Sequence, residues 1–366
     1  MNTLLIAGTR PEIIKIAPLI LKAKENSFAK KVQVKFCFTG QHKTMAEEAM
    51  DIFGIAPDAN FEMMKPNQTL NDISQAVFER LPKVLDEFSP DCILVQGDTT
   101  TAAISALCAF YKKISIGHIE AGLRSFNLDS PFPEEANRKI ISAIASYNFC
   151  PTENAKQNLL RESLSKKNLF VTGNTIVDAI NIISKQYSLD DVKSVHLSIQ
   201  KPFVLITAHR RESFGEGFQN ICNAIKDCAE KFPTHQFIYP VHLNPNVQEP
   251  VFKVLKNFSN VLLIEPVSYL KLLTLLKHCE FVLTDSGGIQ EEAPSFGKYC
   301  IVMRDVTERM ESVQLKMSEL VGTNKEKIVS AVSQQISNPK IFSSRENPYG
   351  DGNAAHRILE ILTTKA

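Results

Sequence analysis

Carboxylates stand directly after apolar runs in the first half of the chain. Asp98 follows the run CILVQG, Glu120 ends the next run, SIGHIE, and Glu134 and Glu135 follow Pro133 at an expected helix start. If the two runs are neighbouring parallel strands, Asp98 and Glu120 project from the same sheet edge and lie close together. Such a cluster can donate and accept protons, which makes Asp98, Glu120 and Glu134 candidate acids and bases. We expect Glu135 to be a helix-capping or solvated carboxylate instead.

Cations and histidines follow other apolar runs. Arg10 and Lys15 come after LLIAG, and His209, Arg210 and His242 come after two runs of the second half. Positive charge is unfavourable at a helix start, so an anionic ligand would neutralise Arg10 and Lys15 there. A histidine such as His209 can transfer a proton or bind a phosphate oxygen. His118 lies inside an apolar run, and we expect it to be a buried core residue.

A glycine-containing turn follows the apolar run EFVLT. Its sequence is DSGG, from Asp285 through Ser286 and Gly287 to Gly288, and a helical segment follows. Glycines let the backbone approach a ligand closely, and a helix start offers free N–H groups to a diphosphate. Glu292, one helical turn further, could accept hydrogen bonds from ribose hydroxyls. The turn matches neither the P-loop nor the GxGxxG pattern, so an ordinary strand-to-helix turn explains it equally well.

Short apolar runs alternate with helix-length amphipathic segments throughout the 366 residues. Runs of this kind are typical of parallel strands covered by helices on both faces, and right-handed crossovers then give doubly wound α/β units. The length predicts two such domains, with the change of domain near Gly173. The carboxyl ends of the strands are where such sheets bind ligands, and a cleft where two of these edges face each other is the expected site.

Composition excludes several classes of protein. The net charge of +1 gives no general attraction to nucleic acid or to an anionic membrane. The eight cysteines are scattered without a CxxC pair, which predicts buried thiols in a reducing cytosol. No spacing of metal ligands is present, so we expect no metal. The N-terminus is typical of a first strand, and no apolar stretch approaches the roughly 18 residues of a membrane span, which predicts a cytoplasmic protein.

Taken together, the motifs resemble those of the non-hydrolysing UDP-N-acetylglucosamine 2-epimerase family of bacteria. The matching stretches are GTRPEIIK, TGQHKTM, VQGDTTT, GHIEAGLRS, PEEANR, PTENAKQNLL, VTGNTIVDA, TAHRRES, PVHLNPNV, TDSGGIQEEAPSFGK and MRDVTER. The resemblance implies two Rossmann-like domains of the GT-B type facing across a cleft, residues 1–172 with a returning C-terminal helix at 353–366, and residues 173–352. It also implies a homodimer without a cofactor.

The same resemblance implies interconversion of UDP-GlcNAc and UDP-ManNAc at C2, through UDP elimination, a 2-acetamidoglucal and UDP re-addition, as a source of ManNAc-type precursors for cell-surface polysaccharide. It implies Asp98, Glu120, Glu134 and His209 as catalytic residues. The implied substrate contacts are Asp98, Glu120 and His209, together with Arg10, Lys15, Val267, Leu272, Ser286, Gly287, Gly288, Glu292 and Arg309. Val267 and Leu272 match the region that contacts uracil.

Many bacterial members also bind a second, activating UDP-GlcNAc, and Gln41, His42, Glu134, Arg210 and His242 fit that pattern. Thr44 and Asn67 depart from it, and these departures leave open both the activation and a modified UDP-HexNAc as substrate. A hydrolysing epimerase that releases ManNAc and UDP is a second alternative. A non-catalytic UDP-sugar sensor is the alternative from a different class, while the acidic cluster argues against a glycosyltransferase and the nucleotide motifs against a glycosidase.

Overall fold

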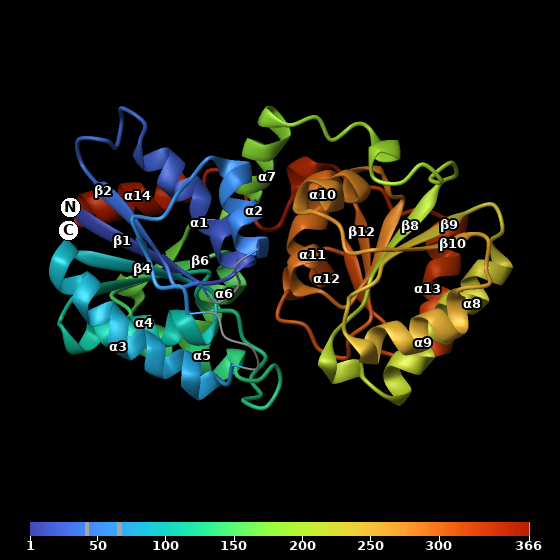
Figure 1. The fold of residues 1–366 in the computed structure, drawn as a ribbon, viewed down its shortest axis with the longest axis horizontal. Helices are drawn as coiled ribbons and strands as arrows, with labels where there is room; N and C mark the ends of the chain where they lie inside the picture. The colour runs from blue at the N-terminus through green and yellow to red at the C-terminus, as the bar shows by residue number, and fades with distance from the viewer. Residues whose placement is uncertain (41–43, 64–67, 366) are drawn as a thin grey trace. The chain divides into compact units, whose positions relative to one another are not determined.

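The computed structural model describes residues 1–40, 44–63 and 68–365. Contacts within the chain divide it into two compact units, Met1–Ile183 with Tyr349–Ala366, and Ser184–Pro348. Each unit is a parallel sheet with helices on both faces (Figure 1). Within the described ranges, every helix is too short or too polar to cross a lipid bilayer.

The first unit contains a seven-stranded parallel sheet in the order β3-β2-β1-β4-β5-β6-β7. Its strands are β1 (Asn2–Ala7), β2 (Gln33–Phe38), β3 (Ala59–Asn60), β4 (Cys92–Gln96), β5 (Ser115–Ile119), β6 (Tyr147–Cys150) and β7 (Leu169–Val171). Its helices are α1 (Arg10–Ala23), α2 (Thr44–Phe53), α3 (Leu70–Phe88), α4 (Thr100–Tyr111), α5 (Glu134–Ile144), α6 (Glu153–Arg161), α7 (Thr175–Gln186) and α14 (Ala354–Lys365). In Figure 1, α1 and α14 cover one face of the sheet, and α3, α4 and α5 cover the other.

The second unit contains a six-stranded parallel sheet in the order β10-β9-β8-β11-β12-β13. Its strands are β8 (Phe203–Thr207), β9 (Gln236–Pro240), β10 (Val261–Ile264), β11 (Phe281–Thr284), β12 (Tyr299–Val302) and β13 (Ser318–Leu320). Its helices are α8 (Glu216–Lys231), α9 (Pro245–Leu255), α10 (Tyr269–His278), α11 (Gly287–Glu292), α12 (Met310–Gln314) and α13 (Lys325–Ser337). The predicted doubly wound α/β architecture is confirmed in both units.

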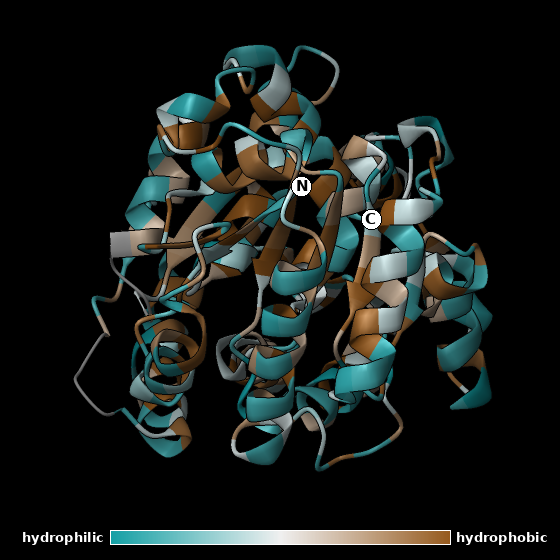
Figure 2. Ribbon diagram, turned by 90° about the vertical axis from the view of Figure 1, so that its right-hand side faces the viewer, coloured by the Kyte–Doolittle hydropathy of each residue, from teal (hydrophilic) through white to brown (hydrophobic). Residues whose placement is uncertain are grey.

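Central strands of both sheets are apolar along their whole length because helices cover both of their faces. All five residues of β4 and of β8 are buried. Figure 2 shows hydrophobic residues concentrated on the strands, while the helices carry polar residues on their outer surfaces. Burial of this kind is the main favourable term in the folding of each unit.

The direction of winding reverses at one place in each sheet. The reversal lies between β1 and β4 in the first unit, and between β8 and β11 in the second. Loops that follow the two strands of such a switch point diverge to opposite faces, which leaves room for a ligand beyond the carboxyl ends of the strands. Arg10, Asp98, His209 and Ser286 follow these four strands, and Glu120 follows β5.

The division between the units differs from the expected boundaries. Sequence analysis placed the change at residue 173 and the return at 353, whereas the contacts place them after Ile183 and before Tyr349. The reason is that α7 packs in the first unit. Its Asp178 carboxylate accepts hydrogen bonds from the backbone amides of Ala354 and Ala355, at 3.2 and 2.9 Å, at the start of α14.

Candidate active site

A buried carboxylate joins two loops at the β1/β4 switch point. Glu12 Oε2 accepts hydrogen bonds from the amides of Gly8 and Thr9, at 3.1 and 2.8 Å, and from the Thr9 hydroxyl at 2.7 Å. Glu12 Oε1 accepts one from the hydroxyl of Thr99, which caps α4, at 2.7 Å. The pKa of Glu12 is raised, because the effect of burial exceeds the lowering effect of these hydrogen bonds. Sequence analysis missed Glu12, yet Thr9-x-x-Glu12 before an apolar run is the signature of a capping box.

Glu120 follows β5 directly and is almost completely buried. Its backbone has φ +69°, in the left-handed region that a side chain other than glycine rarely adopts. Its carboxylate forms an ion pair with Lys15 Nζ and accepts a hydrogen bond from Asn174 Nδ2 at 3.1 Å. Lys15 is therefore neutralised within the protein, where sequence analysis expected only an anionic ligand to do so. Arg10, the first residue of α1, is half-buried.

Asp98 leaves the neighbouring strand at the same sheet edge. Gln96 is opposite Ile119 in the parallel register of β4 and β5, so Asp98 and Glu120 both lie just beyond paired strand ends, as the sequence predicts. Asp98 Oδ2 accepts a hydrogen bond from Arg138 Nε at 2.9 Å and pairs with Nη2 of the same guanidinium at 2.9 Å. Two contacts with one rigid guanidinium fix the direction of this carboxylate.

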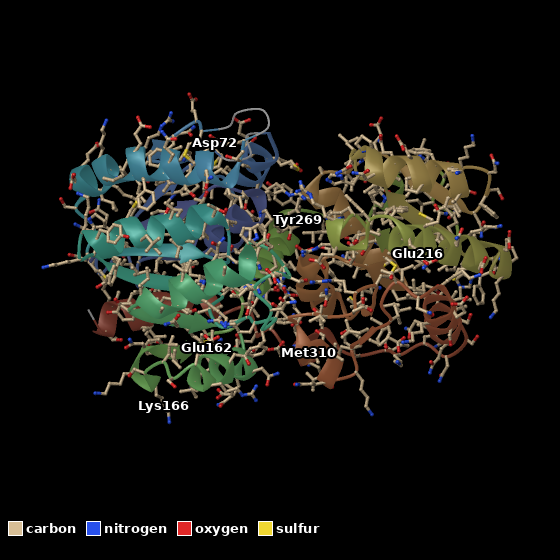
Figure 3. The ribbon with its side chains drawn as sticks, turned by 90° about the horizontal axis from the view of Figure 1, so that it is seen from below. Asp72, Glu162, Lys166, Glu216, Tyr269 and Met310 are labelled. Atoms are coloured by element: carbon tan, nitrogen blue, oxygen red, sulfur yellow. The ribbon has the colours of Figure 1, made fainter. Side chains whose placement is uncertain are left out.

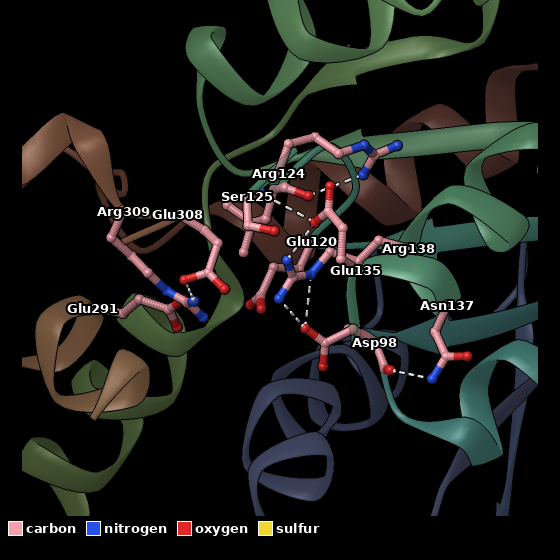
Figure 4. A network of polar contacts seen from close by, with 12 residues as sticks. Asp98, Glu120, Arg124, Ser125, Glu135, Asn137, Arg138, Glu291, Glu308 and Arg309 are labelled. Atoms are coloured by element: carbon pink, nitrogen blue, oxygen red, sulfur yellow. Dashed lines mark hydrogen bonds and ion pairs between the residues drawn. The ribbon is translucent and has the colours of Figure 1, made fainter. Parts of the chain in front are cut away.

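Helix α5 holds the Asp98 carboxylate through Arg138. Glu135 is fully buried and forms an ion pair with Arg138 at 2.9 Å, as Figure 4 shows. It also accepts hydrogen bonds from the amides of Ser125 and Phe126, at 3.0 and 3.1 Å. The prediction that Glu135 is solvated or capping was wrong, because it holds both the loop before α5 and Arg138. Glu134, the first residue of α5, is half-buried.

His118 lies in the middle of this framework and confirms its predicted place in the core. It is fully buried in β5, and its Nε2 is 2.8 Å from the carbonyl oxygen of Gly97, the residue before Asp98. Burial lowers the pKa of His118 to about 4. The ring is therefore neutral near pH 7, and Nε2–H donates to the Gly97 carbonyl. His118 supports the strand that leads to Asp98.

At the β8/β11 switch point, Asp285 holds the loop that follows β8. It is fully buried, and its Oδ2 accepts hydrogen bonds from the amides of His209 and Arg210, both at 2.7 Å. The buried Tyr239 hydroxyl donates to the carbonyl of Ala208 at 2.5 Å, which fixes the same loop from β9. The backbone around His209 is thus held in one conformation, while its side chain is exposed.

Two histidines form a stacked pair on this edge of the second sheet. The rings of His209 and His242 are 5.3 Å apart with an interplanar angle of 13°. His209 Nδ1 is 3.9 Å from Asp285 Oδ1, and His242 Nδ1 accepts a hydrogen bond from the amide of Asn244 at 3.1 Å. The two residues follow adjacent strands, as the sequence predicts, and present imidazole nitrogens that can bind an anion or transfer a proton.

The glycine-containing turn after β11 packs against Arg309. A Cβ atom on Gly287 would lie only 2.9 Å from Arg309 Cζ, whereas a Cβ on Gly288 would meet nothing closer than Ser286 Oγ at 3.9 Å. A methyl group at Gly287 would therefore force the guanidinium to shift, whereas Gly288 leaves the turn open. Ser286 immediately precedes α11 and makes no capping hydrogen bond with its side chain.

Arg309 is buried between two carboxylates that sequence analysis did not identify. Its Nε donates to Glu291 Oε1 at 2.8 Å, and its Nη1 to Glu308 Oε2 at 3.2 Å (Figure 4). Arg304 contacts Glu308 as well, at 3.3 Å. The guanidinium is thus oriented by protein groups before any ligand binds. Both carboxylates lie inside the matching stretches TDSGGIQEEAPSFGK and MRDVTER, but nothing in the sequence indicated that they pair with Arg309.

The remaining candidates lie around α10 and α11. Tyr269, the first residue of α10 and labelled in Figure 3, donates a hydrogen bond to Glu292 Oε1 at 3.0 Å. Glu292 is buried, and Val267 and Leu272, near the start of α10, are half-buried. Of the proposed activator residues, Gln41 and His42 lie outside the described residues. Arg210 Nη1 is 3.8 Å from Glu212 Oε1.

Two predictions from the sequence concern the cysteines and the possible metal ligands. All eight cysteines are buried, which confirms that prediction. Burial raises the pKa of Cys37 and Cys92, for example, to about 12, so these thiols are protonated at neutral pH. In the ranges that the structure describes, His, Cys, Asp and Glu side chains form no group of three or more that could hold a metal ion.

Comparison with known proteins gives the family of the chain. The family model described as UDP-N-acetylglucosamine 2-epimerase matches residues 24–363. The chain belongs to this family. The UDP-N-acetylglucosamine 2-epimerase of Yersinia pestis is 47% identical over 373 residues, which cover 99% of this chain and 98% of the relative. The match confirms the enzyme family that the motifs predict.

Solved structures of family members share both units of the fold. The crystal structure of UDP-GlcNAc 2-epimerase from Neisseria meningitidis bound to UDP-GlcNAc has 45% identity and a TM-score of 0.90, with 99% of each chain covered. The enzyme from Methanocaldococcus jannaschii, in complex with UDP-GlcNAc and UDP, has 36% identity and a TM-score of 0.86, again with 99% of each chain covered.

Proposed function

We propose that the protein interconverts UDP-GlcNAc and UDP-ManNAc at C2 without net hydrolysis of the nucleotide sugar. The observation that carries the proposal is the pair of carboxylates beyond β4 and β5. Asp98 and Glu120 leave adjacent strands, and each is paired with a cation that fixes its direction. Membership of the family supports UDP-GlcNAc as the substrate.

The chemistry requires both a base and a stabilised leaving group, because a C2–H beside an acetamido nitrogen is not acidic. In the forward direction a carboxylate takes the C2 proton, the C1–O bond to UDP breaks, and 2-acetamidoglucal and UDP form. UDP then adds back to C1, and an acid delivers a proton to C2 from the opposite face. The proton and the UDP are both returned, so the products are isomers of the substrates.

In this proposal the first unit supplies the proton transfers. Asp98 and Glu120 are the candidates for the two faces of C2, with Glu134 as a third acid. Lys15 and Arg138 hold the first two carboxylates in place, and general acid–base catalysis of this kind contributes about 10²- to 10⁴-fold to a rate. Arg10 adds a positive charge close to the start of α1, where a diphosphate would be favoured.

The second unit supplies the groups that bind UDP. Ser286, Gly287 and Gly288 are the proposed diphosphate contacts, and Arg309 and His209 stabilise the negative charge that develops on the leaving UDP. Glu292, held by Tyr269, is the proposed ribose ligand. Val267 and Leu272 are the proposed contacts to uracil.

The test is an analysis of the products formed from UDP-GlcNAc. A non-hydrolysing epimerase gives UDP-ManNAc while free UDP remains far below the amount of product, as measured by phosphorus NMR. A hydrolysing enzyme gives UDP in a one-to-one ratio with free ManNAc, and a sensor binds UDP-GlcNAc without forming either product. Either of the last two results would contradict the proposal. The same assay with a panel of UDP-HexNAc substrates tests for a modified sugar.

Three further properties remain predictions from the family resemblance. The protein is expected to act as a homodimer, without a cofactor, and to supply ManNAc-type precursors for a cell-surface polysaccharide. Analytical ultracentrifugation tests the homodimer, because the measured mass would be twice that of the 40.9 kDa chain. Activation by a second UDP-GlcNAc is tested by sigmoidal dependence of the rate on substrate concentration.

A further inference from the structure

Asn174 contacts the Glu120 carboxylate from the point where the chain approaches the end of the first unit. It is almost completely buried between β7 and α7. Its Nδ2 donates to Glu120 Oε2 at 3.1 Å, and its Oδ1 accepts from the amide of Ile176 at 3.1 Å. The two ends of the side-chain amide therefore perform different tasks: one caps α7, and the other holds the carboxylate.

The backbone of Asn174 joins the loop before α7 to the segment in which the chain returns to the first unit. Its amide donates to the carbonyl oxygen of Tyr349 at 2.7 Å, and Tyr349 is the first residue of the returning segment. Beside this bond, Gly173 and Gly350 are in close contact, since a Cβ atom on Gly350 would lie 3.2 Å from Gly173 Cα. Both have positive φ, +91° and +121°. The loop before α7 and the returning segment are thus fixed to each other at Asn174.

Capping alone does not explain an asparagine at this position. Serine, threonine and aspartate cap helices about as well, because the cap needs only an acceptor oxygen. Asparagine adds a donor, and here that donor is buried and directed at the carboxylate that also pairs with Lys15. Two donors on one carboxylate oxygen restrict the rotation of the carboxylate plane, and a buried donor without this partner would be costly.

We propose that Asn174 is a positioning residue for Glu120, and that it ties the orientation of this carboxylate to the paired segments at Gly173 and Tyr349. The inference deepens the proposed function and rests on it. Asn174 does not itself exchange a proton with the substrate, because an amide does not titrate in the range of physiological pH. It keeps one carboxylate oxygen fixed so that the proton transfer at C2 starts from a single geometry.

Two substitutions at Asn174 separate the donor from the cap. Asn174→Ser keeps an acceptor for α7 and removes the amide donor. Asn174→Asp keeps the acceptor and the shape but places a second carboxylate beside Glu120, where two negative charges repel. We expect exchange of the C2 proton with D2O to fall about tenfold in the first variant and about a hundredfold in the second. Affinity for UDP should stay within about twofold, because neither substitution alters a proposed UDP ligand.

Asn324 provides the matched control, because it caps α13 in the second unit through its Oδ1 and the amide of Lys327 at 2.9 Å, and it is exposed. Asn324→Ser and Asn324→Asp should leave C2 exchange unchanged and show the effect of altering a cap by itself. A purely structural role for Asn174 would lower the urea midpoint and the UDP affinity together with the exchange rate. That pattern would overturn the inference, as would exchange at the wild-type rate in both Asn174 variants.

A readout that does not depend on turnover separates this inference from the proposed function. In protein labelled with ¹³C at glutamate carboxylates, the Glu120 resonance is identified by its loss in Glu120→Gln. We expect it to shift in Asn174→Ser and in Gly350→Ala, which strains the paired segments without touching Glu120, and to stay in place in Asn324→Ser. Failure of wild-type protein to exchange the C2 proton would defeat the proposed function, whereas an unmoved resonance in the Asn174 and Gly350 variants would defeat this inference alone.

Discussion

At the β1/β4 switch point, Glu12 accepts hydrogen bonds from two consecutive amides of the loop after β1, and at the β8/β11 switch point Asp285 does the same for the loop after β8. Both carboxylates are buried. Glu12 comes from the helix that follows its loop and reaches Thr99 on the neighbouring loop, whereas Asp285 comes from the end of the neighbouring strand. The two units thus reach the same local solution from different positions in the chain.

What the two edges present to a ligand differs. The first edge presents carboxylates that are paired with buried cations, Glu120 with Lys15 and Asp98 with Arg138. The second edge presents an exposed imidazole, that of His209, and a turn that is open at Gly288. A buried carboxylate that holds the neighbouring loop, Glu12 or Asp285, is therefore part of the fold at each switch point. The chemistry of each edge depends on the other side chains that these loops carry.

The largest effect should come from removing a charge at the first edge. Asp98→Asn and Glu120→Gln should each reduce exchange of the C2 proton in D2O by about 10³-fold or more, because an amide cannot accept the proton. UDP affinity, measured by calorimetry, should stay within roughly tenfold, about 1.4 kcal/mol. Glu326→Gln on the exposed side of α13 is the control for a change of charge. Full exchange in either site variant would show that these carboxylates do not transfer the proton.

Substitution of the loop-holding carboxylates, Glu12 and Asp285, should have equal effects on stability. The effects on C2 exchange and on UDP binding should be opposite in the two variants. An amide keeps one oxygen for the backbone N–H donors but is a weaker acceptor than a carboxylate, so Glu12→Gln and Asp285→Asn should each lower the free energy of unfolding by about 1 to 3 kcal/mol, as measured by urea denaturation. Glu12→Gln should slow C2 exchange more than it weakens UDP binding, and Asp285→Asn should do the reverse. Equal losses of both functions in the two variants would mean that the edges do not have separate roles.

A third carboxylate, Asp178, accepts two backbone amides in the same way, but it anchors α7 to the start of α14 and holds no loop of a switch point. Burial raises its pKa from 3.8 to about 6. Its protonated form is therefore favoured by folding, and its contribution to stability is present below pH 4 and lost as the pH rises through 6. The free energy of unfolding of Asp178→Asn, relative to wild type, should rise by up to about 3 kcal/mol between pH 4 and pH 7. A difference that is flat with pH would contradict the raised pKa.

The smallest expected effect distinguishes two neighbouring glycines of the second edge. Gly287→Ala places a methyl group against the Arg309 guanidinium and should lower the free energy of unfolding by about 1 to 3 kcal/mol. Gly288→Ala meets open space and should change it by less than about 0.5 kcal/mol. Urea denaturation of the two variants side by side gives the comparison. Equal destabilisation would indicate that the contact with Arg309 does not explain the glycine at 287.

The sequence predicts the fold well where the hydrophobic pattern is strong. Runs such as LLIA, CILV and FVLIT are typical of a strand buried on both faces, and they form β1, β4 and β8. The two-residue strand β3 and the strand β13 were not predicted, because so few residues carry no periodicity. The boundary after Ile183 was missed because the anchoring of α7 to α14 joins residues far apart in sequence.

The candidate site was predicted where residues follow strand ends and missed where a partner comes from elsewhere. Asp98 and Glu120 could be placed because parallel topology alone brings residues that follow adjacent strands to one edge, and the same rule placed His209 at the edge of the second sheet. The pairing of Lys15 with Glu120 spans 105 residues of sequence, and no local pattern indicates it. The burial of Glu135 was misjudged for the same reason, since its loop partners fold back from residues before α5. Glu12 is the exception, because the capping-box pattern was visible in the sequence.

The most direct test of the central claim follows the C2 hydrogen of the wild-type protein. UDP-GlcNAc is incubated with the enzyme in D2O, and the recovered UDP-sugars are analysed by mass spectrometry and proton NMR. The account predicts one deuterium at C2 in both UDP-GlcNAc and UDP-ManNAc. Formation of UDP-ManNAc that retains the original hydrogen at C2, or binding of UDP-GlcNAc with neither exchange nor epimer, would contradict it.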